Sequence, residues 1–199
     1  TAQFAALTTA QVGVLTTAQV ANLETADLAA LNSANIRALS TANIVALTSD
    51  QAAALFTAQR APPTTTQVTA LLPDAPLARG TAQFAALTTA QVGVLTTAQV
   101  ANLETADLAA LSNANIRALS TANIVALTSD QAAALSTAQV AALTTAQVAA
   151  LQTDDLNAMG TAQFAALTTA QVAALTTAQV ANLETADLAA MNTANIRAL

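Results

Sequence analysis

The residues that could carry out chemistry are few and mostly acidic. The chain of 199 residues has eleven Asp and Glu against five Arg, and it contains no His, Cys, Lys or Tyr. It therefore lacks an imidazole base, a thiolate or amine nucleophile, and the nitrogen and sulfur ligands that zinc prefers. We expect the chain to have no enzymatic activity and to use no cofactor.

The acidic residues recur in a pattern and form a candidate ion site. They lie at Glu24/Asp27, Glu104/Asp107 and Glu184/Asp187, with an adjacent pair at Asp154 and Asp155. Stacked carboxylates could bind Ca²⁺, but no Gly- and Asp-rich loop supplies the roughly six or more oxygens that this ion takes. We therefore predict that these residues cap helices and that there is no metal site. Arg37, Arg117 and Arg197 could pair with the carboxylates across a coil, which would contribute little stability at a surface.

Charge and hydropathy exclude two further classes of protein. The net charge of −6 leaves no basic face for a nucleic acid. Although 54% of the residues are hydrophobic, no stretch reaches the ~18 apolar residues that a spanning helix needs. We predict no nucleic-acid partner and no membrane span. No signal peptide is visible, because Thr1 opens within a repeated pattern.

Internal repetition fills the chain. Leu recurs every eight residues from Leu7 onward. The same register is occupied by other residues at Pro63, Arg79, Met159 and Met191. The repeating unit, here called the octad, is Thr-Thr-Ala-Gln-Val-Ala-Ala-Leu, as in residues 144–151. Its positions are numbered 1 to 8, so that Leu occupies position 8.

A longer period of 80 residues groups ten octads. Residues 81–135 repeat residues 1–55 except for one exchange of a neighbouring Asn and Ser. We predict superrepeats at 1–80, at 81–160 and, in part, at 161–199, within one continuous solenoid.

Residues 56–79 keep the length of three octads but break their pattern. All four prolines lie here, and Arg60 and Arg79 occupy positions that are elsewhere apolar. One interpretation is an exposed binding loop or hinge. The other is drift in one tolerant repeat with both Arg turned outward, which the regular residues 136–159 of the second copy favour.

The period of eight does not suit a single continuous helix. At about 100° per residue, successive Leu residues would be rotated by about 80°, so no single face would be apolar. A coiled coil needs repeats of seven or eleven residues, and Val-Ala-Ala-Leu does not alternate as a strand does. The chain must therefore start a new helix in each octad.

Signals for helix starts agree with this interpretation. Position 1 is mostly Thr or Ser, the residues that cap helix N-termini. Position 4 is Gln, Asn or Asp nearly throughout, which makes Thr-x-x-Gln a capping box. Asp50 and Asp130 at position 3 would meet the positive end of the helix dipole, and Pro73 occupies a position where proline is tolerated. Each octad is predicted to be a cap followed by a helix of about six residues.

Such short helices are not stable alone in water. Positions 5 and 8 share one helix face and must pack against octads one coil above and below, as in a solenoid. The predicted fold class is all-α: a solenoid of very short helices, with three or four octads per coil. The rival is a solenoid of 16-residue helical hairpins, which is disfavoured because the octads do not alternate. Phe4, Phe84 and Phe164, all at position 5, are predicted to fill the core.

The octad resembles the tandem Leu-Thr-Thr-Ala-Gln-Val-Ala-Ala-Leu tracts of very large repetitive proteins of Gram-negative bacteria, which look like secreted or surface-associated adhesins. The likeness covers almost the whole chain outside residues 56–79. It implies an extracellular or cell-surface location. Separately, the ends of a solenoid without caps expose apolar edges, so we expect self-association end to end or stacking on other repeats of the same parent chain.

Near-identical copies without catalytic residues favour a structural role. We expect a segment of a longer array that serves as a stalk, a spacer or a filament-forming element. The alternative is a binding module that presents a Thr-rich face to a glycan, a peptide or an ice surface. Position-2 residues such as Thr9, Thr17 and Thr25 could form that face, because the caps use the hydroxyls of position 1.

Overall fold

The computed structural model describes residues 2–58, 63–71 and 81–199, in which all the regular structure is helical. The chain divides into two compact units, Thr1–Val94 and Leu95–Leu199. The helices of unit 1 are α1 (Ala2–Ala5), α2 (Thr9–Gly13), α3 (Thr17–Ala21), α4 (Thr25–Ala30), α5 (Ser33–Ala38), α6 (Thr41–Val45), α7 (Ser49–Ala58), α8 (Thr65–Leu71), α9 (Thr81–Ala85) and α10 (Thr89–Val92). The helices of unit 2 are α11 (Thr97–Ala101), α12 (Thr105–Ala110), α13 (Asn113–Ala118), α14 (Thr121–Val125), α15 (Ser129–Ala134), α16 (Thr137–Ala142), α17 (Thr145–Ala150), α18 (Thr153–Asn157), α19 (Thr161–Ala166), α20 (Thr169–Val172), α21 (Thr177–Ala181), α22 (Thr185–Ala190) and α23 (Thr193–Ile196).

Each regular octad forms one helix, as the sequence predicts. The joint between octads consists of two extended residues: Leu135 ends α15 with φ −61° and ψ 132°, and Ser136 begins α16 with φ −68° and ψ 157°. No described residue has a positive φ. The chain therefore turns at every octad without a left-handed residue, and Thr and Leu can occupy the joint.

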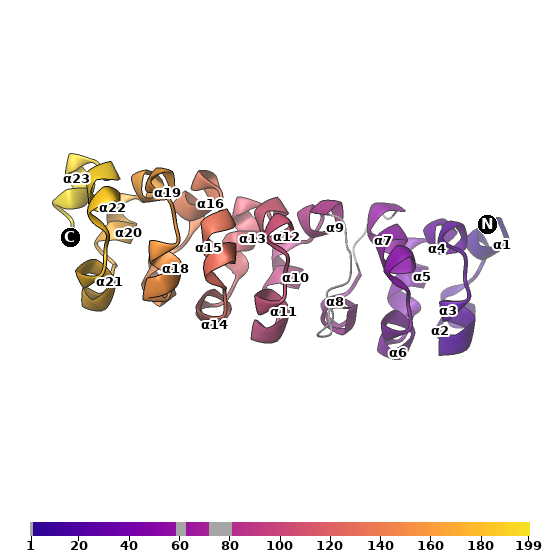
Figure 1. The fold of residues 1–199 in the computed structure, drawn as a ribbon. Helices are drawn as coiled ribbons and strands as arrows, with labels where there is room; N and C mark the ends of the chain where they lie inside the picture. The colour runs from indigo at the N-terminus through magenta and orange to yellow at the C-terminus, as the bar shows by residue number, and fades with distance from the viewer. Residues whose placement is uncertain (1, 59–62, 72–80) are drawn as a thin grey trace. The chain divides into compact units, whose positions relative to one another are not determined.

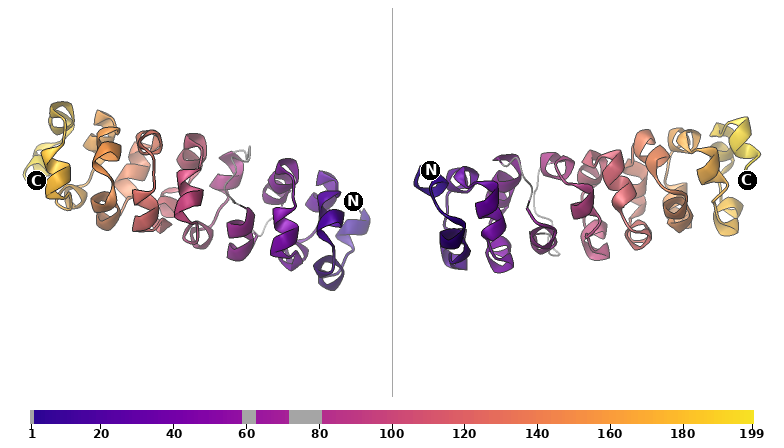
Figure 2. Two further views of the ribbon diagram at one scale, coloured as in Figure 1. Left: turned by 60° about the horizontal axis from the view of Figure 1, so that its bottom comes forward. Right: turned by 180° about the vertical axis from the view of Figure 1, so that it is seen from behind.

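Helices three octads apart pack against each other within each unit. In unit 2, α15 packs between α12 and α18, and α19 packs between α16 and α22. In unit 1, α4 packs between α1 and α7. Figure 1 shows these neighbours side by side, and Figure 2 shows them from two further sides. This packing confirms a solenoid of short helices, and its spacing agrees with three or four octads per coil.

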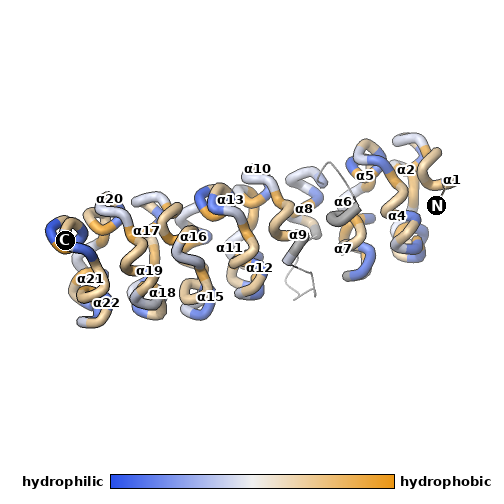
Figure 3. Tube along the Cα trace, turned by 90° about the horizontal axis from the view of Figure 1, so that it is seen from above, coloured by the Kyte–Doolittle hydropathy of each residue, from blue (hydrophilic) through white to orange (hydrophobic). Residues whose placement is uncertain are grey.

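Positions 5 and 8 form the core of both units. At position 5, consecutive octads bury Val148, Leu156 and Phe164 completely, each with 0% exposure. In a solenoid of 16-residue hairpins, alternate octads would lie in an outer layer and be less buried, so this equal burial argues against that arrangement. Phe84 and Phe164 fill the core as predicted, whereas Phe4 is half-buried against the core of unit 1. In Figure 3 hydrophobic segments (orange) and hydrophilic segments (blue) alternate along the tube.

One described helix departs from the rule of one helix per octad. Helix α7 continues through the joint after Leu55 as far as Ala58. In the second copy the equivalent helix ends at Ala134, and Ser136 caps the next one. The first copy has Phe56 at that position, which offers no oxygen to accept a backbone N–H. The helix thus runs into residues 56–58, within the segment where the sequence already breaks the octad pattern. Arg60, Pro73 and Arg79 lie outside the described residues.

Candidate functional site

The capping box predicted from Thr-x-x-Gln is present in both units, and residues 128–131 illustrate it. The backbone N–H of Gln131 donates to Thr128 Oγ1 at 3.2 Å, and the backbone N–H of Thr128 donates to Gln131 Oε1 at 2.9 Å. Two backbone donors at the start of α15 are thereby satisfied. The first turn of each such helix is held by its own octad.

The amide nitrogen of Gln131 donates hydrogen bonds to an earlier coil. Its Nε2 donates to the carbonyl of Leu103 at 2.7 Å, of Val100 at 2.9 Å and of Ala101 at 3.3 Å. These carbonyls belong to the C-terminal end of the octad of α11, where a helix leaves acceptors without an intrahelical partner. A single buried amide therefore satisfies a helix start in one coil and a helix end in another.

The same arrangement recurs along the described part of the chain. The amide nitrogen at position 4 donates to the carbonyl 28 residues earlier, as from Gln147 to Leu119 at 2.8 Å and from Gln179 to Leu151 at 2.8 Å. Every buried polar or charged side chain of the described residues lies at position 4. They are Asn35, Asn43, Gln51, Gln67, Gln91, Gln99, Asp107, Asn115, Asn123, Gln131, Gln139, Gln147, Asp155, Gln163, Gln171, Gln179, Asp187 and Asn195. We call this set the position-4 ladder.

Sequence reasoning assigned position 4 to capping alone and missed its role between coils. A signal was present, because a capping box accepts Glu as well as Gln, yet no octad has Glu at position 4. Glu would satisfy the helix start but could not donate to carbonyls of the earlier coil when ionised. The preference for Gln and Asn, with Asp in only four octads, was the signal that a side-chain N–H is used at most of these positions.

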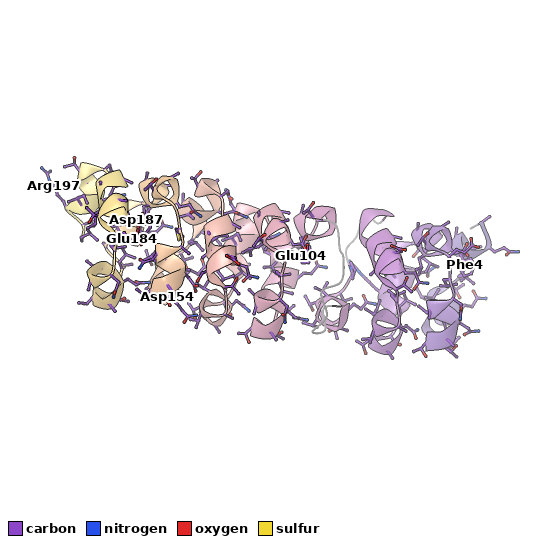
Figure 4. The ribbon with its side chains drawn as sticks, viewed as in Figure 1. Phe4, Glu104, Asp154, Glu184, Asp187 and Arg197 are labelled. Atoms are coloured by element: carbon purple, nitrogen blue, oxygen red, sulfur yellow. The ribbon has the colours of Figure 1, made fainter. Side chains whose placement is uncertain are left out.

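The acidic residues behave differently from their predicted role. Glu24, Glu104 and Glu184 occupy N-cap positions but make no side-chain cap bond, so the prediction that they cap helices is wrong. Asp155 and Asp187 are buried members of the position-4 ladder. Figure 4 labels Glu184 and Asp187 close together; Glu184 is the N-cap of α22, and Asp187 lies in its first turn. Among the described residues, no group of three or more His, Cys, Asp or Glu side chains gathers in a way that could hold a metal ion.

Most of the described position-2 residues are exposed, as the sequence predicts. Thr9, Thr17 and Thr25 are exposed in unit 1. Two position-2 hydroxyls are nevertheless used between coils: Ser129 Oγ donates to Asp155 Oδ1 at 2.9 Å, and Thr169 Oγ1 donates to Asn195 Oδ1 at 3.0 Å. Arg37, Arg117 and Arg197 are also exposed, and their pairing with carboxylates stays a prediction.

Neighbouring threonines of one octad should differ in their effect on stability. Both residues are exposed, but Thr176 is the N-cap of α21, and its Oγ1 accepts the backbone N–H of Gln179 at 3.2 Å. We expect Thr176→Ala to lower the free energy of unfolding by about 1 kcal/mol and Thr177→Ala to change it by less than about 0.5 kcal/mol. Thermal melts followed by circular dichroism compare the two variants. Equal losses would show that the N-cap bond of Thr176 is not what stabilises this octad.

None of the helices in the described residues combines the length and the apolar character needed to cross a membrane.

The repeat pattern matches a known family along most of the chain. The ALTTAQ repeat matches residues 1–25, 20–57, 78–103, 100–137, 148–185 and 180–199. No curated protein and no solved structure was found to match the chain. The tandem repeat predicted from the octads is thereby confirmed. Because the matched segments cover well over half of its length, the chain belongs to the ALTTAQ repeat family.

Proposed function

We propose that the chain is a structural, non-enzymatic segment of a long extracellular or cell-surface repeat protein, where it acts as a stalk, a spacer or a filament-forming element. The position-4 ladder supports this proposal most directly. The amide of Gln171 donates to Leu143, and that of Gln163 donates to Leu135, with the same offset of 28 residues. Because most described octads with an amide at position 4 stack through the same bond, such octads can be added without a new interface.

The exposed surface fits a role in which length matters more than chemistry. Position 2 carries uncharged hydroxyl groups, and only 8% of all residues are charged. The buried apolar and amide groups are used to hold one coil on the next. A regular stack of this kind sets distance along the chain, which is what a stalk or spacer requires.

The filament-forming version is tested on the purified chain of 199 residues. Analytical ultracentrifugation over a range of concentrations and negative-stain electron microscopy measure whether copies join end to end. A heterologous contact that does not close gives polymers that grow with concentration. Monomers at every concentration would contradict this version of the proposal.

The location is tested separately in the cells that make the protein. Antibodies raised against the chain should label intact, unpermeabilised cells or the culture medium, and external protease should remove the signal. Labelling that appears only after the cells are opened would contradict the extracellular and surface roles, whatever the assembly state.

A second candidate is a binding module, which the exposed position-2 hydroxyls favour. The position-2 residues Thr137, Thr145 and Thr161 of unit 2 are exposed. A glycan, a peptide or an ice surface could bind such a face. Glycan arrays and thermal hysteresis measure this directly, and Thr→Val changes at these positions should remove any binding while the caps at position 1 stay intact.

A further inference from the structure

Three places in the position-4 ladder are occupied by carboxyl groups instead of amides, at Asp107, Asp155 and Asp187. Asp155 and Asp187 are each only 4% exposed. Ser129 donates to Oδ1 of Asp155, and Oδ2 of both Asp155 and Asp187 is buried without a hydrogen-bond partner in the described part of the chain. Buried polar atoms are nearly always bonded, so these two oxygens need an explanation.

The equivalent octads show which atom each oxygen replaces. Thr169 Oγ1 donates to Asn195 Oδ1 from 26 residues earlier, as Ser129 Oγ does to Asp155 Oδ1. The Asn195 nitrogen donates to the Leu167 carbonyl, 28 residues earlier, at 2.7 Å. Oδ1 of Asp155 therefore stands where the amide oxygen stands, and Oδ2 takes the place of the amide nitrogen.

The same 28-residue register predicts which backbone carbonyl lies opposite Oδ2 of each aspartate. Counting 28 residues back from Asp155 reaches Leu127, and from Asp187 it reaches Met159. At other octads this carbonyl accepts an N–H. An ionised carboxylate has no hydrogen to donate and would place negative charge against a carbonyl oxygen, whereas a protonated carboxyl can donate.

The charged groups around the two aspartates do not favour ionisation. Asp155 lies on α18, which packs against α15 and α21; these helices carry Asp130, Asp154 and no basic residue. The helix α14, which precedes Leu127, carries no charge. Asp187 lies on α22 beside Glu184, and α22 packs against α19, which carries no charge. The octad that ends at Met159 adds only Asp154 and Asp155.

The surroundings of both aspartates raise the pKa of the carboxyl group above its ordinary value. Burial raises the pKa of Asp155, the Ser129 hydrogen bond partly opposes this, and Asp154 raises it further. Burial also raises the pKa of Asp187, and the Glu184 carboxylate adds to the increase.

We propose that Asp155 and Asp187 take up a proton when the coils of unit 2 are stacked, and that each carboxyl O–H then donates to the carbonyl of Leu127 or Met159. The two residues make the stacking of unit 2 sensitive to pH. The folded chain binds these protons more tightly than the unfolded chain does, so acid favours stacking. The gain is complete below pH about 4, the ordinary value for Asp, and is lost as the pH rises through the higher pKa of the folded state.

The test compares the full chain with the double variant Asp155→Asn/Asp187→Asn at pH 5.0 and pH 7.5. Asn occurs naturally at position 4, and its N–H donates at both pH values. We expect the unchanged chain to melt at a higher temperature at pH 5.0 than at pH 7.5. The double variant should raise Tm at pH 7.5 by about 2–4 °C for each substitution and remove most of the dependence on pH.

The control is Glu24→Gln/Asp50→Asn, which makes the same change in charge at exposed residues of unit 1 and should leave the dependence on pH in place. A second measurement needs no variant: carboxyl ¹³C NMR of the unchanged chain should give titration midpoints for Asp155 and Asp187 above the ordinary value for Asp of about 4. Midpoints at or below that value, or a double variant that keeps the pH dependence, would overturn the proposal.

Discussion

Replacing Gln131 by Ala should lower the free energy of unfolding by about 2–4 kcal/mol, because the carbonyls of the earlier coil lose a buried donor and Thr128 loses the acceptor of its N–H. Gln131 is 2% exposed, so water cannot readily replace the lost bonds. Hydrogen exchange of the backbone amides around α15, together with thermal melting, measures the loss.

Gln11 provides the matched control for this prediction. It makes the same capping box with Thr8, but it is exposed and the hydrogen bonds described for it lie within its own octad. Gln11→Ala should therefore cost only about 1 kcal/mol. A further pair, Gln131→Glu and Gln11→Glu, keeps the capping acceptor and removes the N–H donor. Similar losses at the two positions would contradict a stabilising bond between coils.

Replacing Phe164 by Ala should be the most damaging single change in the core of unit 2, at about 3–5 kcal/mol. The ring is 0% exposed, and α19 carries it between α16 and α22. A solenoid is held together by contacts between neighbouring coils, so a cavity at one coil weakens the coupling between the octads on either side. We expect the melt of unit 2 to broaden or to split into two steps.

Calorimetry and hydrogen exchange on the two sides of α19 measure that loss of coupling. Phe4, which is half-buried at the same octad position, is the control. Phe4→Ala should cost less than Phe164→Ala, since less apolar surface is lost from the core. If both changes cost the same, burial between coils would not be what makes Phe164 important.

The stability of this fold depends on satisfying helix ends rather than on long helices. A helix such as α20, at Thr169–Val172, has almost all of its backbone donors and acceptors near one end or the other. Thr168 and Gln171 satisfy the start of that helix, and Gln171 also donates to Leu143 in an earlier coil. This double use of one side chain explains why so short a repeat can form a stack.

The sequence by itself determined most features that depend on residues close together in the chain, although not the missing cap bonds of the glutamates. The Leu period placed positions 5 and 8 in the core, and Thr-x-x-Gln placed the helix starts at the observed residues, as at Thr144 and Gln147. Capping and the sharing of a helix face act over three or four residues, so residue types and spacing were sufficient to predict them. The absence of a hydroxyl at Phe56 was equally visible, although its consequence for α7 was not predicted.

Only the tertiary structure decided which octads meet and what position 4 does there. The bond from Gln139 to Leu111 spans 28 residues, although the packed helices are three octads apart. That offset depends on how far the chain turns at each joint, and small angles at many joints add up before two coils touch. Asp155 is buried and Asp154, adjacent in sequence, is exposed, because only one face of α18 packs against the neighbouring coils.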